Sequence, residues 1–141
     1  MKAITLVLLF SFTTLIGETY GQKVINEIPA EVYFIRATGA KAKQIAFRVF
    51  VDNKLACKIN EKKYSVHQIS SGKHEFSAQF KGSKIKKRTI MHDVVLEADH
   101  TYYYHIKVEV SGLGNRPYLE LLDREAGEIF VRKFELDNKC F

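Results

Sequence analysis

From residue 31 onward, apolar and polar side chains alternate along a series of short segments, which is the pattern of half-buried β-strands. Such segments lie at 31–36, 46–51, 55–59, 64–66, 74–80, 90–96, 102–110 and 119–121. The longest places on one face Tyr102, Tyr104, Ile106, Val108 and Val110. Tyr103 falls on the other face, where we expect it at the surface. Strands separated by turns roughly every ten residues predict one antiparallel β-sandwich or barrel of about eight strands.

Turn-forming residues separate these segments. Asp52-Asn53-Lys54 has the composition of a tight turn, because Asp and Asn tolerate left-handed backbone and bond to it locally. After the next turn, at residues 60–63, we expect Tyr64 and Val66 to face the core. A further turn at Ser70-Ser71-Gly72 leads into a strand whose inward face carries His74, Phe76, Ala78 and Phe80. A loop is expected over residues 112–117.

The C-terminal part of the chain is open to two interpretations. Asp123 has the right chemistry for a helix N-cap, and Ile129, Phe130 and Phe134 would then share one helical face. Gly127 and the β-branched Val131 weaken a helix. We favour a short helix over residues 124–133, with a final strand as the alternative.

The N-terminus has the features of a secretory signal peptide. A positive charge at Lys2 precedes a mostly apolar stretch at 4–16, and small residues follow it. This stretch is shorter than the roughly 20 residues that a membrane span needs, although a retained anchor is the alternative. We expect cleavage after Gly21, no lipid anchor because no Cys follows the stretch, and an exported periplasmic or extracellular protein. The expected organisation is a signal peptide at 1–21, a lead-in at 22–30 and the β-domain at 31–141.

Positive charge is concentrated in one stretch. The net charge is +6, and it stays +6 without residues 1–21, which contain Lys2 and Glu18. The cations of the stretch are Lys81, Lys84, Lys86, Lys87 and Arg88. They fit either a solvated hairpin tip or edge strand, or a patch that binds anionic polysaccharide or lipopolysaccharide. No nucleic-acid-binding motif is present, so a nucleic-acid partner is not expected.

The candidates for catalysis and metal binding are weak. His67 and His74 flank one turn, but simple alternation places them on opposite faces, and no zinc-ligand spacing is present. Ser70 and Ser71 lie near these histidines without a nucleophile-elbow motif. No phosphate-binding glycine loop is present either. We expect no catalytic residue, no metal site and no cofactor, and hence no enzyme.

The chain has two cysteines, Cys57 and Cys140. Alternation puts Cys57 on the inner face of a strand, and export would place both residues where disulfides persist. We slightly favour a disulfide between them, which would tie down the C-terminal tail. The alternative is a buried thiol at Cys57 and a second free thiol at Cys140.

Several segments resemble the bacterial DUF2846 family. Glu31-Val-Tyr-Phe-Ile-Arg36 is similar to its opening strand, and Phe47-Arg-Val-Phe-Val-Asp-Asn-Lys-Leu55 to its V-x-V-D-G-K turn. Ser71-Gly-Lys-His74 is similar to its P-G-K-H turn, Leu96-Glu-Ala-Asp-His-Thr-Tyr-Tyr103 to its L-x-A-G-K-T-Y-Y segment, and Arg116-Pro-Tyr-Leu-Glu-Leu-Leu-Asp123 to its closing strand. The match covers roughly residues 29–135, nearly all of the chain after the leader.

This resemblance implies a β-sandwich of immunoglobulin or transthyretin type in the bacterial envelope, with hairpins that also resemble PEGA and carboxypeptidase-regulatory-like modules. It brings no activity and no catalytic residues. The chain departs from the family at Asn53 and Ser71, and His100 falls near the usual turn glycine. We therefore expect a non-catalytic envelope domain that binds a protein or surface partner. The alternatives are a binder of anionic glycan or lipopolysaccharide and, in third place, a hydrolase.

Overall fold

A computed structural model of the chain describes residues 28–39, 45–82, 84–112 and 114–137. These residues contain nine strands and one helix, and the strands belong to two sheets. The elements are β1 Ala30–Arg36, β2 Phe47–Val51, β3 Lys54–Ile59, β4 Lys63–Ile69, β5 Gly72–Gln79, β6 Met91–Leu96, β7 Thr101–Ser111, β8 Gly114–Leu122, α1 Arg124–Lys133 and β9 Glu135–Leu136.

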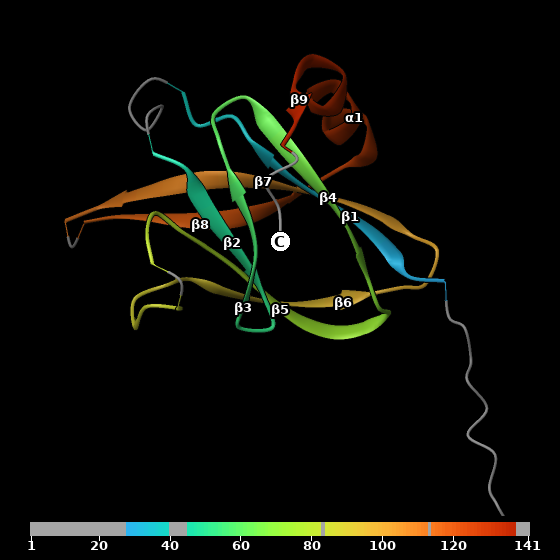
Figure 1. The fold of residues 1–141 in the computed structure, drawn as a ribbon, viewed down its shortest axis with the longest axis horizontal. Helices are drawn as coiled ribbons and strands as arrows, with labels where there is room; N and C mark the ends of the chain where they lie inside the picture. The colour runs from blue at the N-terminus through green and yellow to red at the C-terminus, as the bar shows by residue number, and fades with distance from the viewer. Residues whose placement is uncertain (1–27, 40–44, 83, 113, 138–141) are drawn as a thin grey trace, which may run out of the picture.

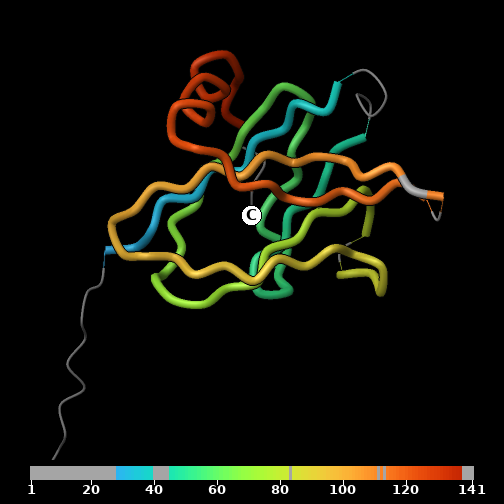
Figure 2. Tube along the Cα trace, turned by 180° about the vertical axis from the view of Figure 1, so that it is seen from behind, coloured from blue at the N-terminus to red at the C-terminus, as the bar shows by residue number. Residues whose placement is uncertain are grey.

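The strands form two packed layers, which confirms the β-sandwich (Figures 1 and 2). One sheet has the order β8-β7-β1-β4-β9 and the other has the order β3-β2-β5-β6. Most neighbours are antiparallel, as expected, but β1–β7 and β4–β9 are parallel. Five strands, β2 to β6, separate β1 from β7 along the chain, and β7 then pairs with β1 in the same direction.

The inner faces of the two sheets make the core, and most of the expected inward residues lie there. Phe34 is fully buried, and its ring centroid lies 5.4 Å from that of Phe76 and 6.1 Å from that of Tyr104. Cys57 is also fully buried in this core. The turn before β3 forms as predicted, since Asp52 and Asn53 both have positive φ.

The prediction for β4 is wrong by one residue. Val32 pairs with His67 and Phe34 pairs with Ser65, so Ser65, His67 and Ile69 lie on the core side. Tyr64 and Val66 therefore face the opposite side of the sheet. Because side chains alternate with a period of two, a shift of one residue exchanges the two faces. Tyr64 and Val66 are more apolar than Ser65 and His67, so hydrophobicity at these four positions pointed to the wrong face. Ile69 is the apolar residue on the correct face.

The predicted helix forms over the expected residues, and its alternative as a strand does not. The carboxylate of Asp123 accepts a hydrogen bond of 2.8 Å from the backbone N–H of Ala126, which caps the helix. The helix packs on the outer face of the five-stranded sheet and buries Tyr103, which is 8% exposed. The expectation of a surface Tyr103 is therefore wrong, because strand alternation cannot reveal a helix that covers the outer face.

No helix in the described ranges is long and apolar enough to cross a bilayer.

Gly127 is the residue that lets α1 approach the sheet. A Cβ atom at this position would lie 2.6 Å from the Cβ of Tyr103, well inside van der Waals contact. The glycine that weakened the helix prediction is thus explained by packing.

We expect Gly127→Ala to lower the free energy of unfolding by about 1–3 kcal/mol, because it overpacks this contact. An open helix position would instead gain roughly 1 kcal/mol from the same change. Urea denaturation followed by circular dichroism measures the effect. In a Tyr103→Gly background, which removes the Cβ of residue 103 together with the ring, Gly127→Ala should become neutral or stabilising. A gain in stability from the single substitution would contradict the packing argument.

The β7–β8 hairpin extends beyond the rest of the sandwich (Figure 1). β8 begins at Gly114, so most of the loop expected over residues 112–117 is strand. Val110, which was expected to face the core, is 80% exposed because it lies on this projecting part. The hairpin forms one wall of the end of the molecule that also carries the basic stretch.

Candidate anion-binding site

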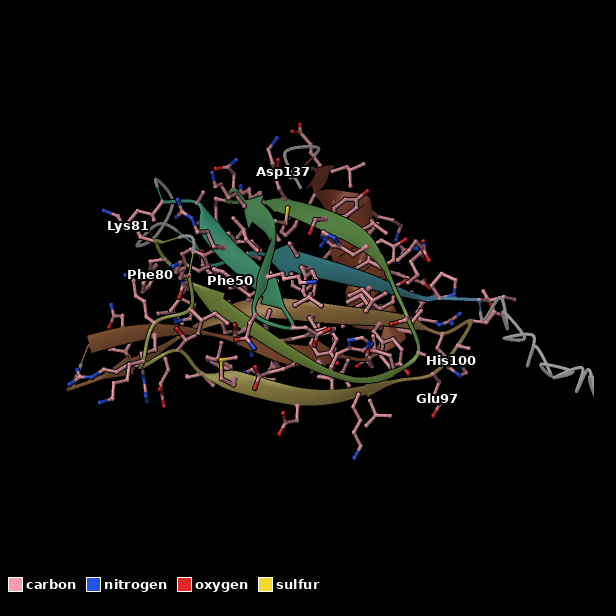
Figure 3. The ribbon with its side chains drawn as sticks, turned by 60° about the horizontal axis from the view of Figure 1, so that its bottom comes forward. Phe50, Phe80, Lys81, Glu97, His100 and Asp137 are labelled. Atoms are coloured by element: carbon pink, nitrogen blue, oxygen red, sulfur yellow. The ribbon has the colours of Figure 1, made fainter. Side chains whose placement is uncertain are left out.

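The basic stretch lies in the irregular loop that joins the antiparallel pair β5 and β6. It therefore forms the tip of a hairpin, which is one of the positions predicted for it, and it does not lie on an edge strand. All five of its cations are exposed: Lys81, Lys84, Lys86, Lys87 and Arg88. Figure 3 shows Phe80 and Lys81 at one end of the sandwich, with Glu97 and His100 at the opposite end. The loop is therefore available to a ligand in solution.

The buried side chain of Gln79 organises this loop. It is 3% exposed, and its Nε2 donates to the carbonyl oxygens of Lys81 at 3.0 Å and Lys84 at 2.9 Å. Its Oε1 accepts from the backbone N–H of Lys86 at 3.2 Å and from Oγ1 of Thr89 at 3.1 Å. Sequence analysis missed this role, since alternation placed Gln79 on the outward face as an ordinary polar residue. The amide fixes the loop before any ligand arrives.

A hollow of about 320 Å³ lies where this loop meets β8. Its cations are Lys86 and Arg88 from the loop and Arg116 from the hairpin. Apolar side chains, among them Ala78, Phe80 and Pro117, complete the wall. The structure thus brings two of the five predicted cations together with an arginine from a distant segment, whereas Lys81, Lys84 and Lys87 do not line this hollow.

Arg116 lines this hollow, and one of its hydrogen-bond donors has no partner among the described residues. Its Nη2 donates to Oε2 of Glu109 at 2.6 Å, but its Nε is buried and has no hydrogen-bond partner among the described residues. Leaving a buried donor without a partner costs roughly 1–3 kcal/mol, and more for a charged group. The side chain as a whole is 38% exposed, so its guanidinium is accessible to an anion. Sequence analysis did not single out Arg116, because it stands alone beside Pro117 rather than in a charge cluster.

A second cluster joins Ser70, His74 and Asp52 in the order of a catalytic triad. Nδ1 of His74 lies 2.7 Å from Oδ2 of Asp52, and Nε2 lies 3.4 Å from Oγ of Ser70. Nε2 is closer, at 2.8 Å, to the carbonyl oxygen of Ser70. A carbonyl oxygen only accepts, so Nε2 carries a proton in this arrangement and does not serve as a base toward Ser70. The cluster therefore links the turn that contains Asp52 to the turn that contains Ser70.

Electrostatics at this cluster agree with a structural role. Burial raises the pKa of Asp52, but hydrogen bonds from the backbone N–H of Glu75 and from His74 outweigh it, so the pKa lies below its usual value. Asp52 therefore stays ionised at neutral pH as an acceptor in both bonds.

The predicted separation of His67 and His74 onto opposite faces is wrong, because β4 has the other phase. Both point toward the interior, but they come from different sheets. His67 bonds to Oγ of Ser65 and packs against Phe34, and burial lowers its pKa. Within the described ranges, no group of three or more potential ligands is arranged to hold a metal ion.

Two further sequence predictions concern residues outside the described ranges. Cys57 lies on the inner face of β3 as expected, but Cys140 is not among the described residues, so the disulfide stays a prediction. The signal peptide at 1–21 and most of the lead-in also lie outside these ranges.

No family model matches the chain, and no curated protein matches it. The resemblance to the DUF2846 family therefore stays a prediction.

Proposed function

We propose that this chain is a non-catalytic, exported module of the cell envelope that binds an anionic surface molecule. The observation that carries the proposal is the hollow between the basic loop and β8, where Lys86, Arg88 and Arg116 meet. This geometry favours the glycan or lipopolysaccharide alternative over a general protein partner, because it brings three cations together at one place.

Preorganisation supports binding rather than mere solvation at this site. A solvated charged loop has no need of fixed geometry, whereas the bonds from Gln79 hold this loop in one conformation. A ligand then loses less free energy to ordering the site. Arginine and lysine together suit phosphate or carboxylate groups, since the arginine fork matches their oxygens and lysine adds a compact charge.

We expect the triple variant Lys86→Gln, Arg88→Gln, Arg116→Gln to bind lipopolysaccharide at least tenfold more weakly than the unmodified protein at physiological salt. Each lost charge-assisted hydrogen bond contributes about 1.5–3 kcal/mol in the binding site. The measurement is isothermal titration calorimetry, with a heparin column as the second probe.

The matched control removes the same net charge elsewhere, through Lys54→Gln, Lys73→Gln and Arg132→Gln, all at exposed positions. We expect this control to lose less than threefold in affinity, because distant surface charges are screened at physiological salt. Equal losses in the two triple variants would contradict a localised site. Failure of the unmodified protein to bind either probe would contradict the proposed function itself.

A further inference from the structure

A second, larger hollow adjoins the anion-binding site. It has a volume of about 630 Å³, and Phe80 and Asn115 line both hollows. Its apolar side chains lie just after β1, just before β2, just after β5 and on the β7–β8 hairpin: Ala37, Ile45, Phe80, Ile106, Val108 and Val110. A volume of this size is in the range of small-ligand sites.

Two of these side chains are exposed in a way that calls for an occupant. Ile45 is 40% exposed and Val110 is 80% exposed, and they border the same hollow. Isolated apolar residues at the surface are ordinary, but a concave apolar site beside a cluster of cations is typical of a binding site.

The ligand must match both hollows at once. Its anionic group would occupy the 320 Å³ hollow near Arg88 and Arg116, and its apolar part would pass Phe80 into the larger hollow. A polysaccharide has no apolar part to place there. An acidic peptide would present its charges along an extended chain, whereas the cations here cluster at the smaller hollow. The larger hollow has Lys107, and this lysine is already paired with Glu120.

We propose that the two hollows together bind a single-chain lipid with a phosphate head group. This inference rests on the proposed function, because the phosphate would use the cations already described. The partly exposed guanidinium of Arg116 would donate to a phosphate oxygen, Lys86 and Arg88 would neutralise the remaining charge, and the acyl chain would cover Ile45, Val108 and Val110.

The test is a homologous series of hexyl, octyl and decyl phosphate, titrated below the concentrations at which they form micelles. Each CH₂ group that enters the apolar hollow should tighten binding roughly fourfold, so each two-carbon step should tighten it roughly fifteenfold. Inorganic phosphate should compete weakly for the same site. Decanol, which lacks the head group, should bind at least tenfold more weakly than decyl phosphate, and decanoate should bind less tightly than decyl phosphate.

Variants assign the two parts of the ligand to the two hollows. Ile45→Ser with Val110→Ser should flatten the chain-length dependence while leaving the affinity for inorganic phosphate unchanged. The matched control is Leu121→Ser, which removes a side chain of 56% exposure outside both hollows and should leave the whole series unchanged. Arg116→Gln should weaken every phosphate in the series by a similar factor.

The outcomes separate this inference from the proposed function. Affinity for lipopolysaccharide or heparin without any dependence on chain length would overturn the lipid inference and leave the anion-binding function standing. Equal binding of decanol and decyl phosphate, or tighter binding of decanoate, would overturn the assignment of a phosphate head group. A protein that binds none of the anions would overturn both proposals.

Discussion

Replacing Arg36 by methionine should lower the free energy of unfolding by about 3–5 kcal/mol at neutral pH, the cost of breaking a buried ion pair. Arg36 is fully buried, and its Nε lies 3.2 Å from Oε2 of Glu61. Its Nη1 donates to the carbonyl oxygen of Ile59 at 2.8 Å, and its guanidinium lies 4.0 Å from the ring centroid of Phe47. Methionine fills part of the volume but leaves the carboxylate of Glu61, itself only 8% exposed, without its counter-charge.

The pH dependence of this loss has a definite sign. Burial raises the pKa of Glu61, but bonds from Thr38 and Gly39 and the charge of Arg36 outweigh it, so the pKa lies below its usual value. The carboxylate therefore contributes stability above its unfolded pKa, and that stability is lost as the pH falls through its lower folded pKa. Without Arg36 the folded pKa rises, so the destabilisation by Arg36→Met should shrink when Glu61 is protonated.

Guanidinium denaturation at neutral and acidic pH measures both effects. The matched control is Arg132→Met on the exposed side of α1, which should change the free energy of unfolding by less than about 1 kcal/mol, the upper end of a helix-terminus charge effect. A loss below 1 kcal/mol for Arg36→Met, or one that grows at acidic pH, would contradict the role assigned to this ion pair.

A disulfide between Cys57 and Cys140 should account for up to about 4 kcal/mol of stability, because it would close a loop of roughly 80 residues. The described part of the tail supports the pairing. Asp137 is buried, its backbone N–H donates to Tyr64, and its Oδ2 accepts from the backbone N–H of Asn60 at 3.1 Å. Asn60 follows Cys57 by three residues, and Cys140 follows Asp137 by three, which span at most roughly 11 Å.

Alkylation of the exported, denatured protein followed by mass spectrometry checks the pairing. The predicted spectrum has no alkylated cysteine before reduction, two after it, and an unacylated N-terminus at Gln22. Reduced protein should then unfold at a lower guanidinium concentration than oxidised protein. The double variant Cys57→Ala, Cys140→Ala should have nearly the same free energy of unfolding as the reduced protein, and should differ from it only by the cost of removing the buried sulfur atom of Cys57. Two alkylated thiols without reduction would refute the disulfide.

The fold could be predicted from the sequence because its determinants are local. Period-two alternation defines β1, β2 and β5, and the Asp123 cap defines the start of α1. The phase of β4 could not be predicted, since its core face carries the polar Ser65 and His67 and follows from pairing with β1, which lies about thirty residues away.

The candidate site could be predicted only in part, for a related reason. The charge run at 81–88 is visible in the sequence, but which of its cations converge depends on how Gln79 bends the loop. Arg116 joins them through the β7–β8 hairpin, nearly thirty residues further along the chain. A single arginine and a single glutamine carry no pattern that alternation or motif rules detect.

The way in which Gln79 holds its loop also bears on how such a protein can diversify. Among the described residues, its amide bonds mainly to main-chain atoms, namely the carbonyls of Lys81, Gly82 and Lys84 and the N–H of Lys86, and to one side chain, that of Thr89. Main-chain carbonyls are the same in every amino acid, and a main-chain N–H is present in every one except proline, so the outward side chains can be exchanged for other non-proline residues without losing the bonds to Gln79. Mutation can therefore alter the charge and selectivity of this surface separately from the stability of the sandwich beneath it.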